Sequence, residues 1–389
     1  MREPGSRVLL VLGTSAGGVG RHVRMLADGL SREGHPVVVA GPAGTEEAFG
    51  FSAVARFARV PVSDRPRPLS DLRAVWRLRA LAAGADVVHA HGLRAGALAA
   101  LALAGRRTFL VVTLHNALTA GGAVGAVYEA LERVVARRAD QVLVVAPDLG
   151  ERMAARGARS VAAAVVPAPP LSPPRRTPAE VRAELAGLEA AQPQARHVTS
   201  GRPVVLTVAR LAQQKGLETL LEAAAGPYDA EPLFVVAGDG PLRAELQERV
   251  DAGGLPVLLL GDRSDVADLL QVASALVVPS RWEGQPLSVQ EALRSGTPVV
   301  GTAVGGVPAM VGDAGLLVPP GDAAALRREI ARLLADPVLA ARLAASAVAR
   351  PLPDEQDALR AVLRAYAVPA ARRGARSPAA DGGPDRGPF

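Results

Sequence analysis

The sequence predicts an α/β protein with two doubly wound, parallel-sheet domains in tandem. Short runs of valine and leucine, without alternation between polar and apolar residues, recur along the 389-residue chain. Such runs are typical of parallel strands that are buried on both faces. Segments with helical periodicity separate them, and a proline-rich break near the middle divides the chain in two. We therefore expect two open sheets, each covered by helices on both sides.

The first domain is predicted over residues 1–166. Its strand-length runs are VLLVL, PVVVA, ADVVHA, FLVVTL, QVLVV and AAVV. Between the first two runs, the segment VGRHVRMLADGLSREG places Val23, Leu26 and Leu30 on one helical face and ends at Gly34. A buried strand followed by an amphipathic helix that stops at glycine is the repeating unit of a doubly wound fold.

The other boundaries follow from changes in composition. Residues 167–203 combine many prolines with polar residues around one short helical stretch, which indicates an interdomain linker. The runs PVVLTV, LFVVAG, VLLLG, SALVVP and PVVGT then predict a second domain over residues 204–350. A closing helix is expected over 351–366, and the Pro-, Gly- and Arg-rich tail 367–389 is expected to be disordered. Ligands of open parallel sheets bind at the carboxyl ends of the strands, so we expect the active site between the two domains.

Composition limits the class of protein. Cysteine is absent, which excludes disulfides, thiolate metal sites and cysteine nucleophiles. The longest uncharged apolar run, residues 95–105, is too short to span a bilayer, so we expect a soluble, cytoplasmic protein. Residues 1–200 contain 25 arginines and 16 acidic residues, a balance of +9. Because aromatic residues make up only 3%, nucleic acid is not an expected partner. An anionic acceptor fits better, as does peripheral binding to the inner face of an anionic membrane, with Arg133, Arg137 and Arg138 close together on a predicted helix. A merely solvated basic surface stays open as the alternative.

The chain contains a single lysine. Lysine and arginine together number 44, and Lys215 in ARLAQQKGLETLL is the only lysine among them. Together with Arg210, it lies between a predicted strand and a helix expected to begin near Leu217. Two cations at a helix N-terminus form an anion site, and a diphosphate is its natural occupant. The alternative of an incidental surface lysine stays open at this point.

Two carboxylates follow in SRWEGQPLSVQEALRSGTPVV. Glu283 lies in the loop after the run SALVVP, and Glu291 lies in a helix expected to begin near Leu287. If the interval were wholly helical, the two would lie ~12 Å apart along the axis. The acid and base of glycosidases lie ~5 to 9.5 Å apart. A pair of binding carboxylates, one for a sugar hydroxyl and one for a ribose, fits this spacing better.

In this order and spacing, the motifs resemble those of retaining glycosyltransferases of family 4. The matching features are ARLAQQKG, the GDGP turn at residues 238–241, the two glutamates and SGTPVVGTAVGGVPAMV, and the resemblance extends to about residue 366. It implies the GT-B fold, in which two Rossmann-like domains face across a cleft. It also implies sugar transfer from a nucleoside diphosphate sugar with retention of anomeric configuration. The donor-binding residues that it implies are Gly17, Gly18, Arg210, Lys215, Gly238, Gly240, Glu283, Gly284, Gln285, Pro286, Leu287 and Glu291.

The resemblance also implies a role for each charged group. Arg210 and Lys215 would hold the donor diphosphate, Glu291 would bind the nucleotide ribose, and Glu283 would face the donor sugar. His115 in VVTLHNA matches the family's histidine near the transferred sugar. The catalytic residues implied are therefore Arg210, Lys215, His115 and Glu283. No acidic cluster accompanies them, so we expect a metal-independent enzyme without a cofactor.

Other interpretations of these motifs are weaker. The loop TSAGGVGRHV, with Gly17 and Gly18, does not fit an NAD-binding fingerprint, because no acidic residue stands at the end of the second predicted strand. It also lacks the Lys-Ser/Thr of a P-loop. His89 and His91 in VVHAHGL have the spacing of metal ligands, but no third ligand is evident. We expect them to be structural or to lie on the acceptor side.

Two departures from the family pattern bear on the donor sugar. Gly284-Gln285-Pro286 stands where the family usually has Gly-Phe-Gly, and the proline removes one backbone N–H. Residues 167–170, Pro-Ala-Pro-Pro, replace a common Pro-Asn-Gly turn. The expected acceptor is a lipid or a cell-envelope glycan. The alternatives are a nucleotide-sugar epimerase or phosphorylase on the same scaffold and a non-catalytic nucleotide-sugar-binding protein.

Overall fold

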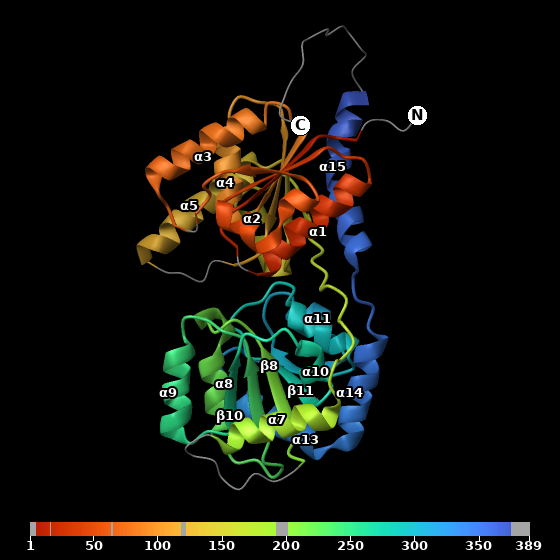
Figure 1. Cartoon of the computed structure of the whole chain (residues 1–389). Coiled ribbons are helices and arrows are strands. Elements are labelled where there is room, and N and C mark those ends of the chain that lie inside the picture. The colour runs from red at the N-terminus through yellow and green to blue at the C-terminus, as the bar shows by residue number, and fades with distance from the viewer. Residues whose placement is uncertain (1–4, 16, 64, 118–121, 192–200, 375–389) are drawn as a thin grey trace. The chain divides into compact units, whose positions relative to one another are not determined.

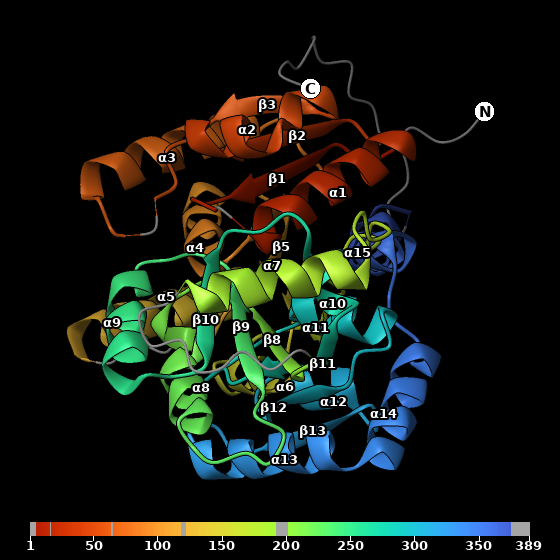
Figure 2. The same cartoon turned by 60° about the horizontal axis from the view of Figure 1, so that its bottom comes forward.

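The computed structural model describes residues 5–15, 17–63, 65–117, 122–191 and 201–374. The chain divides into two compact units, one of Met1–Pro167 with Pro353–Phe389 and one of Ala168–Leu352. Each unit contains one parallel sheet with helices on both faces (Figures 1 and 2). The doubly wound α/β fold predicted from the sequence is confirmed.

The first unit contains a seven-stranded sheet in the order β3-β2-β1-β4-β5-β6-β7. Its strands are β1 (Val8–Leu12), β2 (Val37–Gly41), β3 (Arg56–Arg59), β4 (Val87–His91), β5 (Phe109–Leu114), β6 (Gln141–Val144) and β7 (Val161–Ala163). Its helices are α1 (Gly18–Arg32), α2 (Ala43–Phe49), the 3-10 helix η1 (Phe51–Ala53), α3 (Pro68–Leu81), α4 (Leu93–Ala102), α5 (Gly122–Arg138), α6 (Pro147–Ala155) and α15 (Glu355–Gly374). Every pair of neighbouring strands is parallel.

Helices from both ends of the chain cover one face of this sheet. α1 contacts α15, and a Cβ on Gly29 of α1 would lie 3.2 Å from the side chain of Leu359. α15 continues to Gly374, beyond residue 366 where the sequence predicted its end. Alanine and arginine, which favour helix, are frequent in the added segment. The remainder of the predicted disordered tail, 375–389, lies outside the described residues.

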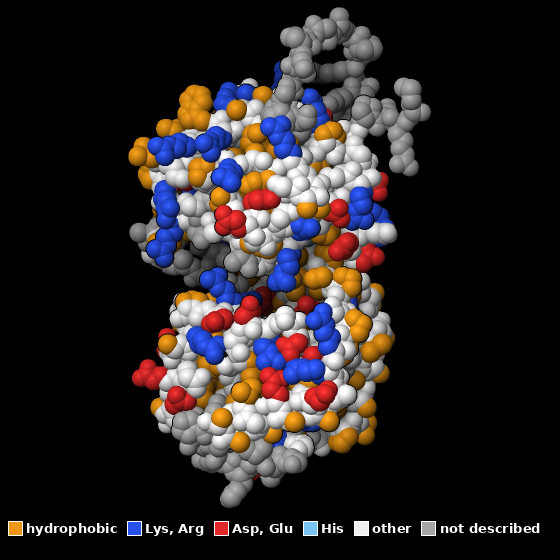
Figure 3. Space-filling model, viewed as in Figure 1, with side chains coloured by type: hydrophobic (Ala, Val, Ile, Leu, Met, Phe, Trp, Pro, Cys, Tyr) orange, Lys and Arg blue, Asp and Glu red, His pale blue; other side chains and the backbone are white. Residues whose placement is uncertain are grey.

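On the opposite face, α4 contacts both α3 and α5. α4 packs closely on the sheet, since a Cβ on Gly96 would lie 2.6 Å from Val112 of β5. α3 presents Leu69, Leu72 and Trp76 to solvent. Figure 3 shows hydrophobic and basic side chains side by side over this helix, at the upper left.

The second unit contains a six-stranded sheet in the order β10-β9-β8-β11-β12-β13. Its strands are β8 (Val204–Val208), β9 (Leu233–Ala237), β10 (Val257–Gly261), β11 (Ala273–Val278), β12 (Val299–Thr302) and β13 (Gly315–Val318). Its helices are α7 (Pro178–Ala190), the 3-10 helix η2 (Gln213–Lys215), α8 (Leu217–Ala224), α9 (Arg243–Gly253), α10 (Val266–Leu270), α11 (Leu287–Arg294), α12 (Val307–Val311), α13 (Ala323–Ala335) and α14 (Pro337–Ala349).

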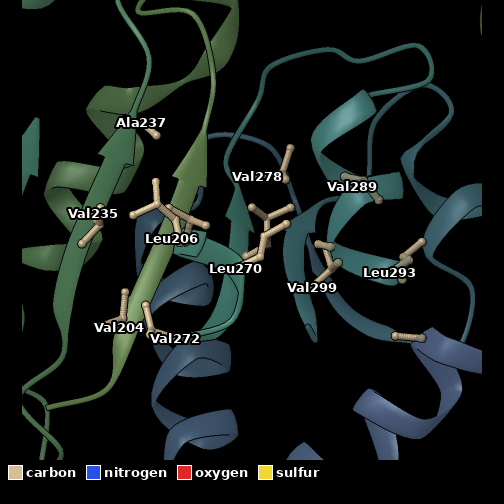
Figure 4. Packing of buried hydrophobic residues seen from close by; sticks show 14 of the residues in the cluster. Val204, Leu206, Val235, Ala237, Leu270, Val272, Val278, Val289, Leu293 and Val299 are labelled. Atoms are coloured by element: carbon tan, nitrogen blue, oxygen red, sulfur yellow. The ribbon is translucent and has the colours of Figure 1, made fainter. Parts of the chain in front are cut away.

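Two apolar layers sandwich the second sheet. Val204 and Leu206 of β8 face a cluster that includes α10 and α11, as Figure 4 shows, whereas Val205 faces α8, α9 and α13. This alternation explains why the strand has no polar face. Helix α7, within the segment 167–203 expected to be a linker, contributes Val181 and Leu185 to the first of these layers.

Candidate functional site

The loop after β8 carries the two cations singled out by the sequence. η2 ends at Lys215, and α8 begins at Leu217, as predicted. Gly216 between them has φ of 60°, and a Cβ there would lie 2.2 Å from the carbonyl oxygen of Pro279. Only glycine fits this position, because it tolerates both the left-handed backbone and the close approach. The single lysine is therefore held at the N-terminus of α8 by a tight contact with the loop after β11.

Lys215 forms an ion pair with Glu283. Its Nζ donates to Glu283 Oε1 at 2.5 Å, and the hydroxyl of Ser280 donates to the same oxygen at 2.7 Å. The carboxylate is buried, with 6% of Glu283 exposed, whereas Lys215 is partly exposed. A buried carboxylate requires a cation or several donors. The lone lysine is thus not an incidental surface residue, and the sequence did not predict its contact with Glu283.

Backbone contacts hold Glu283 in place. Its carbonyl oxygen accepts from the N–H of Gly306 at 3.0 Å, and a Cβ on Gly305 would lie 1.9 Å from that oxygen. Thr302 Oγ1 at the end of β12 donates to the carbonyl of Ser280 at 2.5 Å. Ser280, Thr302 and the two glycines were not predicted as site residues, although the GTAVGG motif that contains three of them was part of the resemblance. Their contacts hold the loop that carries the carboxylate.

Arg210 differs from Lys215 in its surroundings. It is exposed and makes no ion pair within the part of the chain that the structure describes. Its guanidinium group carries five N–H donors in a planar arrangement that matches phosphate oxygens. The site therefore contains one cation fixed by a carboxylate and one that is available to an anion.

The GDGP turn packs against the loop that carries Arg210. Gly238 has φ of 143°, and a Cβ there would lie 1.9 Å from the carbonyl oxygen of Ala209. At Gly240, a Cβ would lie 2.4 Å from the carbonyl oxygen of Leu211. The N–H of Leu211 also donates to the carbonyl of Asp239 at 3.0 Å. These glycines thus fix the backbone on both sides of Arg210, a packing role that the resemblance does not imply.

Helix α11 carries the second glutamate. It begins at Leu287, as predicted, with Pro286 at its N-cap, and Glu291 lies partly buried within it. Gly284 and Gln285 form the loop between Glu283 and this helix. The two glutamates therefore lie in a loop and in the helix that follows it, the arrangement inferred from the sequence.

The glycine loop of the first unit leads into α1. Gly17 is the N-cap residue of this helix and Gly18 is its first residue. A Cβ on Gly17 would meet no described residue within 4 Å. Packing among the described residues therefore does not explain glycine at position 17.

Four histidines gather at the carboxyl end of the first sheet. His89 and His91 point to the same side of β4, His115 follows β5, and His22 lies in α1. The rings of His89 and His91 stack with centroids 4.2 Å apart, and His91 Nδ1 lies 3.1 Å from His115 Nε2. His22 meets His91 and His115 edge-on at 5.8 and 5.6 Å. We call these four residues the histidine cluster.

A tyrosine from α15 fixes one end of the histidine cluster. Tyr366 Oη lies 2.8 Å from His89 Nδ1, and Thr113 Oγ1 lies 2.7 Å from His89 Nε2. Both nitrogens of His89 are therefore occupied. The sequence did not predict His22 or Tyr366 as site residues, because their contacts cross long intervals of the chain.

The pKa of every ring in the histidine cluster is lowered, so the cluster is neutral at neutral pH. Burial lowers the pKa of His89 to about 3 and that of His115 to about 4. Burial, reinforced by the neighbouring histidines, lowers the pKa of His22 and of His91 well below the ordinary value. Two buried nitrogens, His22 Nδ1 and His91 Nε2, have no hydrogen-bond partner among the described residues.

The described residues contain no group of three or more His, Asp or Glu side chains that could hold a metal ion. The histidine cluster is thus a set of stacked and hydrogen-bonded rings. None of the described helices is long and apolar enough to cross a membrane.

Comparison with known proteins gives two matching sequence profiles. "Glycosyl transferase 4-like domain" matches residues 17–169, and "Glycosyl transferases group 1" matches residues 202–336. The alpha-D-kanosaminyltransferase of Streptomyces kanamyceticus is 34% identical over 174 residues, which are 43% of this chain and 45% of that enzyme. The chain thus spans less than half the length of this relative. Glycogen synthase of Mycobacterium tuberculosis is 28% identical over 403 residues, 93% of each chain.

Solved structures show the same architecture. The Anabaena protein Alr3699/HepE in complex with UDP-glucose superimposes with a TM-score of 0.75 at 19% identity, covering 93% of this chain and 99% of that one. At this identity the likeness shows the fold alone. It confirms the GT-B fold that the resemblance implied.

Proposed function

We propose that this chain, which combines two glycosyltransferase-type domains in the GT-B fold, transfers a sugar from a nucleoside diphosphate sugar to an acceptor hydroxyl. The observation that carries the proposal is the arrangement of Arg210 and Lys215 before α8, with Lys215 paired to the buried Glu283. A free guanidinium, a fixed ammonium and a helix N-terminus together favour a diphosphate. We further propose that the configuration at the anomeric carbon is retained.

Stabilisation of the leaving diphosphate is the proposed source of catalysis. Lys215 has three N–H donors, and Glu283 accepts from one of them, so two remain for phosphate oxygens. Because Glu283 fixes the ammonium group in advance, little reorganisation is needed as negative charge develops. Arg210 and Lys215 then supply the charge that a metal ion supplies elsewhere, and no cofactor is required. Retention requires departure and attack on the same face of the sugar, which needs little help from a protein base.

The remaining site residues are proposed to orient the donor. Glu283 would accept from a hydroxyl of the sugar, and Glu291 would accept from the ribose. His115 would lie near the transferred sugar. The open space at Gly17 supports a close approach of the ligand to the backbone of the glycine loop, because no described residue lies within 4 Å of a Cβ placed there.

The decisive experiment incubates the full chain with nucleoside diphosphate sugars, with UDP-glucose first, and with lipid and glycan acceptors in the presence of EDTA. Transfer with the anomeric configuration of the donor is the expected outcome. Isomerised donor would indicate an epimerase, and binding without turnover would indicate a non-catalytic protein. Activity lost in EDTA and restored by magnesium or manganese would contradict metal independence.

The two glutamates are expected to affect different steps. Glu291→Ala should weaken binding of UDP by about tenfold or more, because a hydrogen bond to a charged group is lost. Glu283→Ala should not weaken UDP binding, since it removes a negative charge beside Lys215, but it should slow transfer. Calorimetry with UDP and turnover assays measure the two effects. Glu222→Ala, on the exposed side of α8, is the control and should change neither. The reverse pattern would show that the two roles are exchanged.

We also propose that the first unit binds an anionic membrane surface through α3. Leu69, Leu72 and Trp76 recur at helical spacing and are 76%, 55% and 66% exposed. Arg73 and Arg77 lie exposed among them, whereas Asp71 is paired with Arg94 at 2.8 Å. An apolar stripe flanked by arginines is typical of helices that lie in the membrane interface. This surface would bring the enzyme to a lipid acceptor.

Vesicle binding is expected to depend on this helix. The chain should co-sediment with phosphatidylglycerol vesicles more than with phosphatidylcholine vesicles, and less at high salt. Replacing Leu69, Leu72 and Trp76 with serine should abolish binding. Val338→Ser with Val348→Ser removes two equally exposed apolar residues of α14 and should leave binding intact. Equal binding to both kinds of vesicle would refute the proposal.

A further inference from the structure

His91 contacts His115, the proposed catalytic histidine, and this contact indicates a function for His91. We propose that His91 is a positioning residue that fixes His115 in the tautomer with its proton on Nδ1. His115 then acts as a neutral hydrogen-bond donor. That the recipient is an oxygen of the transferred sugar rests on the proposed function, whereas the tautomer itself does not.

Only one proton can lie between the two rings. His91 Nδ1 and His115 Nε2 are 3.1 Å apart, within hydrogen-bond distance. The pKa of each of the two imidazoles is lowered, so at neutral pH each is neutral and has one N–H and one bare nitrogen. Either His91 Nδ1–H donates to His115, or His115 Nε2–H donates to His91.

The second nitrogen of His91 decides between these alternatives. His91 Nε2 is buried and has no partner among the described residues. If His115 were the donor, the proton of His91 would have to lie on Nε2, where it would be an orphaned buried N–H. Orphaned buried backbone N–H groups are rare in folded proteins, and under-satisfied carbonyls are somewhat less so. We extend this preference to the imidazole ring. The proton of His91 therefore belongs on Nδ1, and that of His115 on its own Nδ1.

The surroundings prevent His91 from escaping this arrangement by rotation. Its ring is 2% exposed and stacks on His89, which is itself tied to Tyr366 and Thr113. His22 closes the other side edge-on. Among the described residues, the titratable groups that the structure places in contact with or adjacent to the pair are His22, His89 and Tyr366. A ring held this firmly imposes its proton position on its neighbour.

The tautomer determines what His115 can do. Its Nε2 accepts from His91 and is not free to remove a proton from an acceptor hydroxyl. Its Nδ1–H can donate to an oxygen without bringing a positive charge. His115 is therefore a donor that orients its ligand, and the reaction proceeds without a histidine base.

Nuclear magnetic resonance of histidine nitrogens tests the assignment directly. The chain has only six histidines, so long-range ¹H–¹⁵N spectra of the ¹⁵N-histidine-labelled full chain can be assigned by single substitutions. In the wild type, His115 should show the neutral Nδ1–H pattern. In the His91→Leu variant, His115 should show a mixture of the two neutral tautomers or the Nε2–H tautomer alone. His35→Gln is the control and should leave the signals of His115 unchanged, because the His35 ring lies outside the cluster and is hydrogen-bonded to the carbonyl of Ser6. An Nε2–H pattern in the wild type, or an unchanged pattern in His91→Leu, would overturn the proposal.

Kinetics provides the second readout. His91→Leu should lower kcat by about tenfold to a hundredfold, with a smaller change in KM for the donor, because the hydrogen bond that orients His115 is lost. His91→Asn places an amide N–H near the position of Nδ1 and should restore part of the loss. Equal kcat in the two variants would contradict a positioning role. If the wild type shows Nδ1–H but turns over no donor, the positioning stands and the proposed function fails.

Discussion

Replacing Lys215 with alanine is expected to lower donor turnover by about a hundredfold or more, the effect of losing one preorganised donor to a developing oxyanion. The loss should be in kcat as well as in kcat/KM, because the interaction strengthens as the diphosphate departs. Lys215→Arg should recover only part of it. A guanidinium must fit beside the N-terminus of α8 and against Glu283, and it cannot concentrate its charge on one oxygen.

A double variant separates the chemistry of Lys215 from its contribution to stability. Lys215→Ala also deprives the buried Glu283 of its cation, so its melting temperature should fall. Glu283→Gln removes the need for that cation. In this background the further loss of Lys215 should leave the melting temperature unchanged and still lower turnover. Equal turnover of Glu283→Gln and the double variant, or wild-type turnover of Lys215→Arg, would show that the lysine serves the fold alone.

The protein is expected to lose stability steeply below pH 6.5. The unfolded chain takes up protons at histidine near the ordinary pKa of 6.5, whereas burial in the fold lowers the pKa of His89 to about 3. His22 and His91 are shifted in the same direction by the same cause. In the interval between these values the unfolded state binds more protons, so acid favours unfolding.

The expected magnitude is large for a few side chains. At a histidine whose pKa is lowered in this way, each pH unit within that interval removes up to ~1.4 kcal/mol of stability, and the other two buried histidines act in the same direction. Against a total of ~5 to 15 kcal/mol, this loss should lower the melting temperature clearly between pH 6.5 and pH 5. Stability contributed by their neutral forms is fully present above pH 6.5.

Thermal melts between pH 4.5 and 7.5 measure this dependence. His89→Gln keeps hydrogen-bonding groups near Tyr366 and Thr113 but cannot be protonated, so unfolding at pH 5.5 should take up about one proton fewer. His35→Gln, at a histidine outside the cluster, is the matched control and should leave the dependence largely intact. A flat profile between pH 7 and 5.5 would mean that the cluster is hydrated or charged in solution.

The sequence alone was enough to predict the class of fold and much of the order of its elements. Strands buried on both faces need continuous apolar runs, and those runs are visible without any tertiary information. The same is true of the helix beginnings at Leu217 and Leu287, which follow local signals. Motif spacing also singled out the two cations and the two glutamates as candidate site residues, because each pair lies within a short stretch of chain.

The sequence did not predict the edge strands β3 and β13. An edge strand has one neighbour, so RFAR and GLLV form strands without a long apolar run. Their existence depends on a sheet already present beside them.

Only the tertiary structure decided which side chains meet. Lys215 and Glu283 are 68 residues apart, and His89 and Tyr366 are 277 residues apart. A parallel sheet brings the ends of distant strands to one edge, so contacts there depend on strand order and register, which local patterns do not encode. The neutrality of the histidine cluster has the same origin. A histidine carries its ordinary pKa in the chain, and only burial among other rings and away from water changes it.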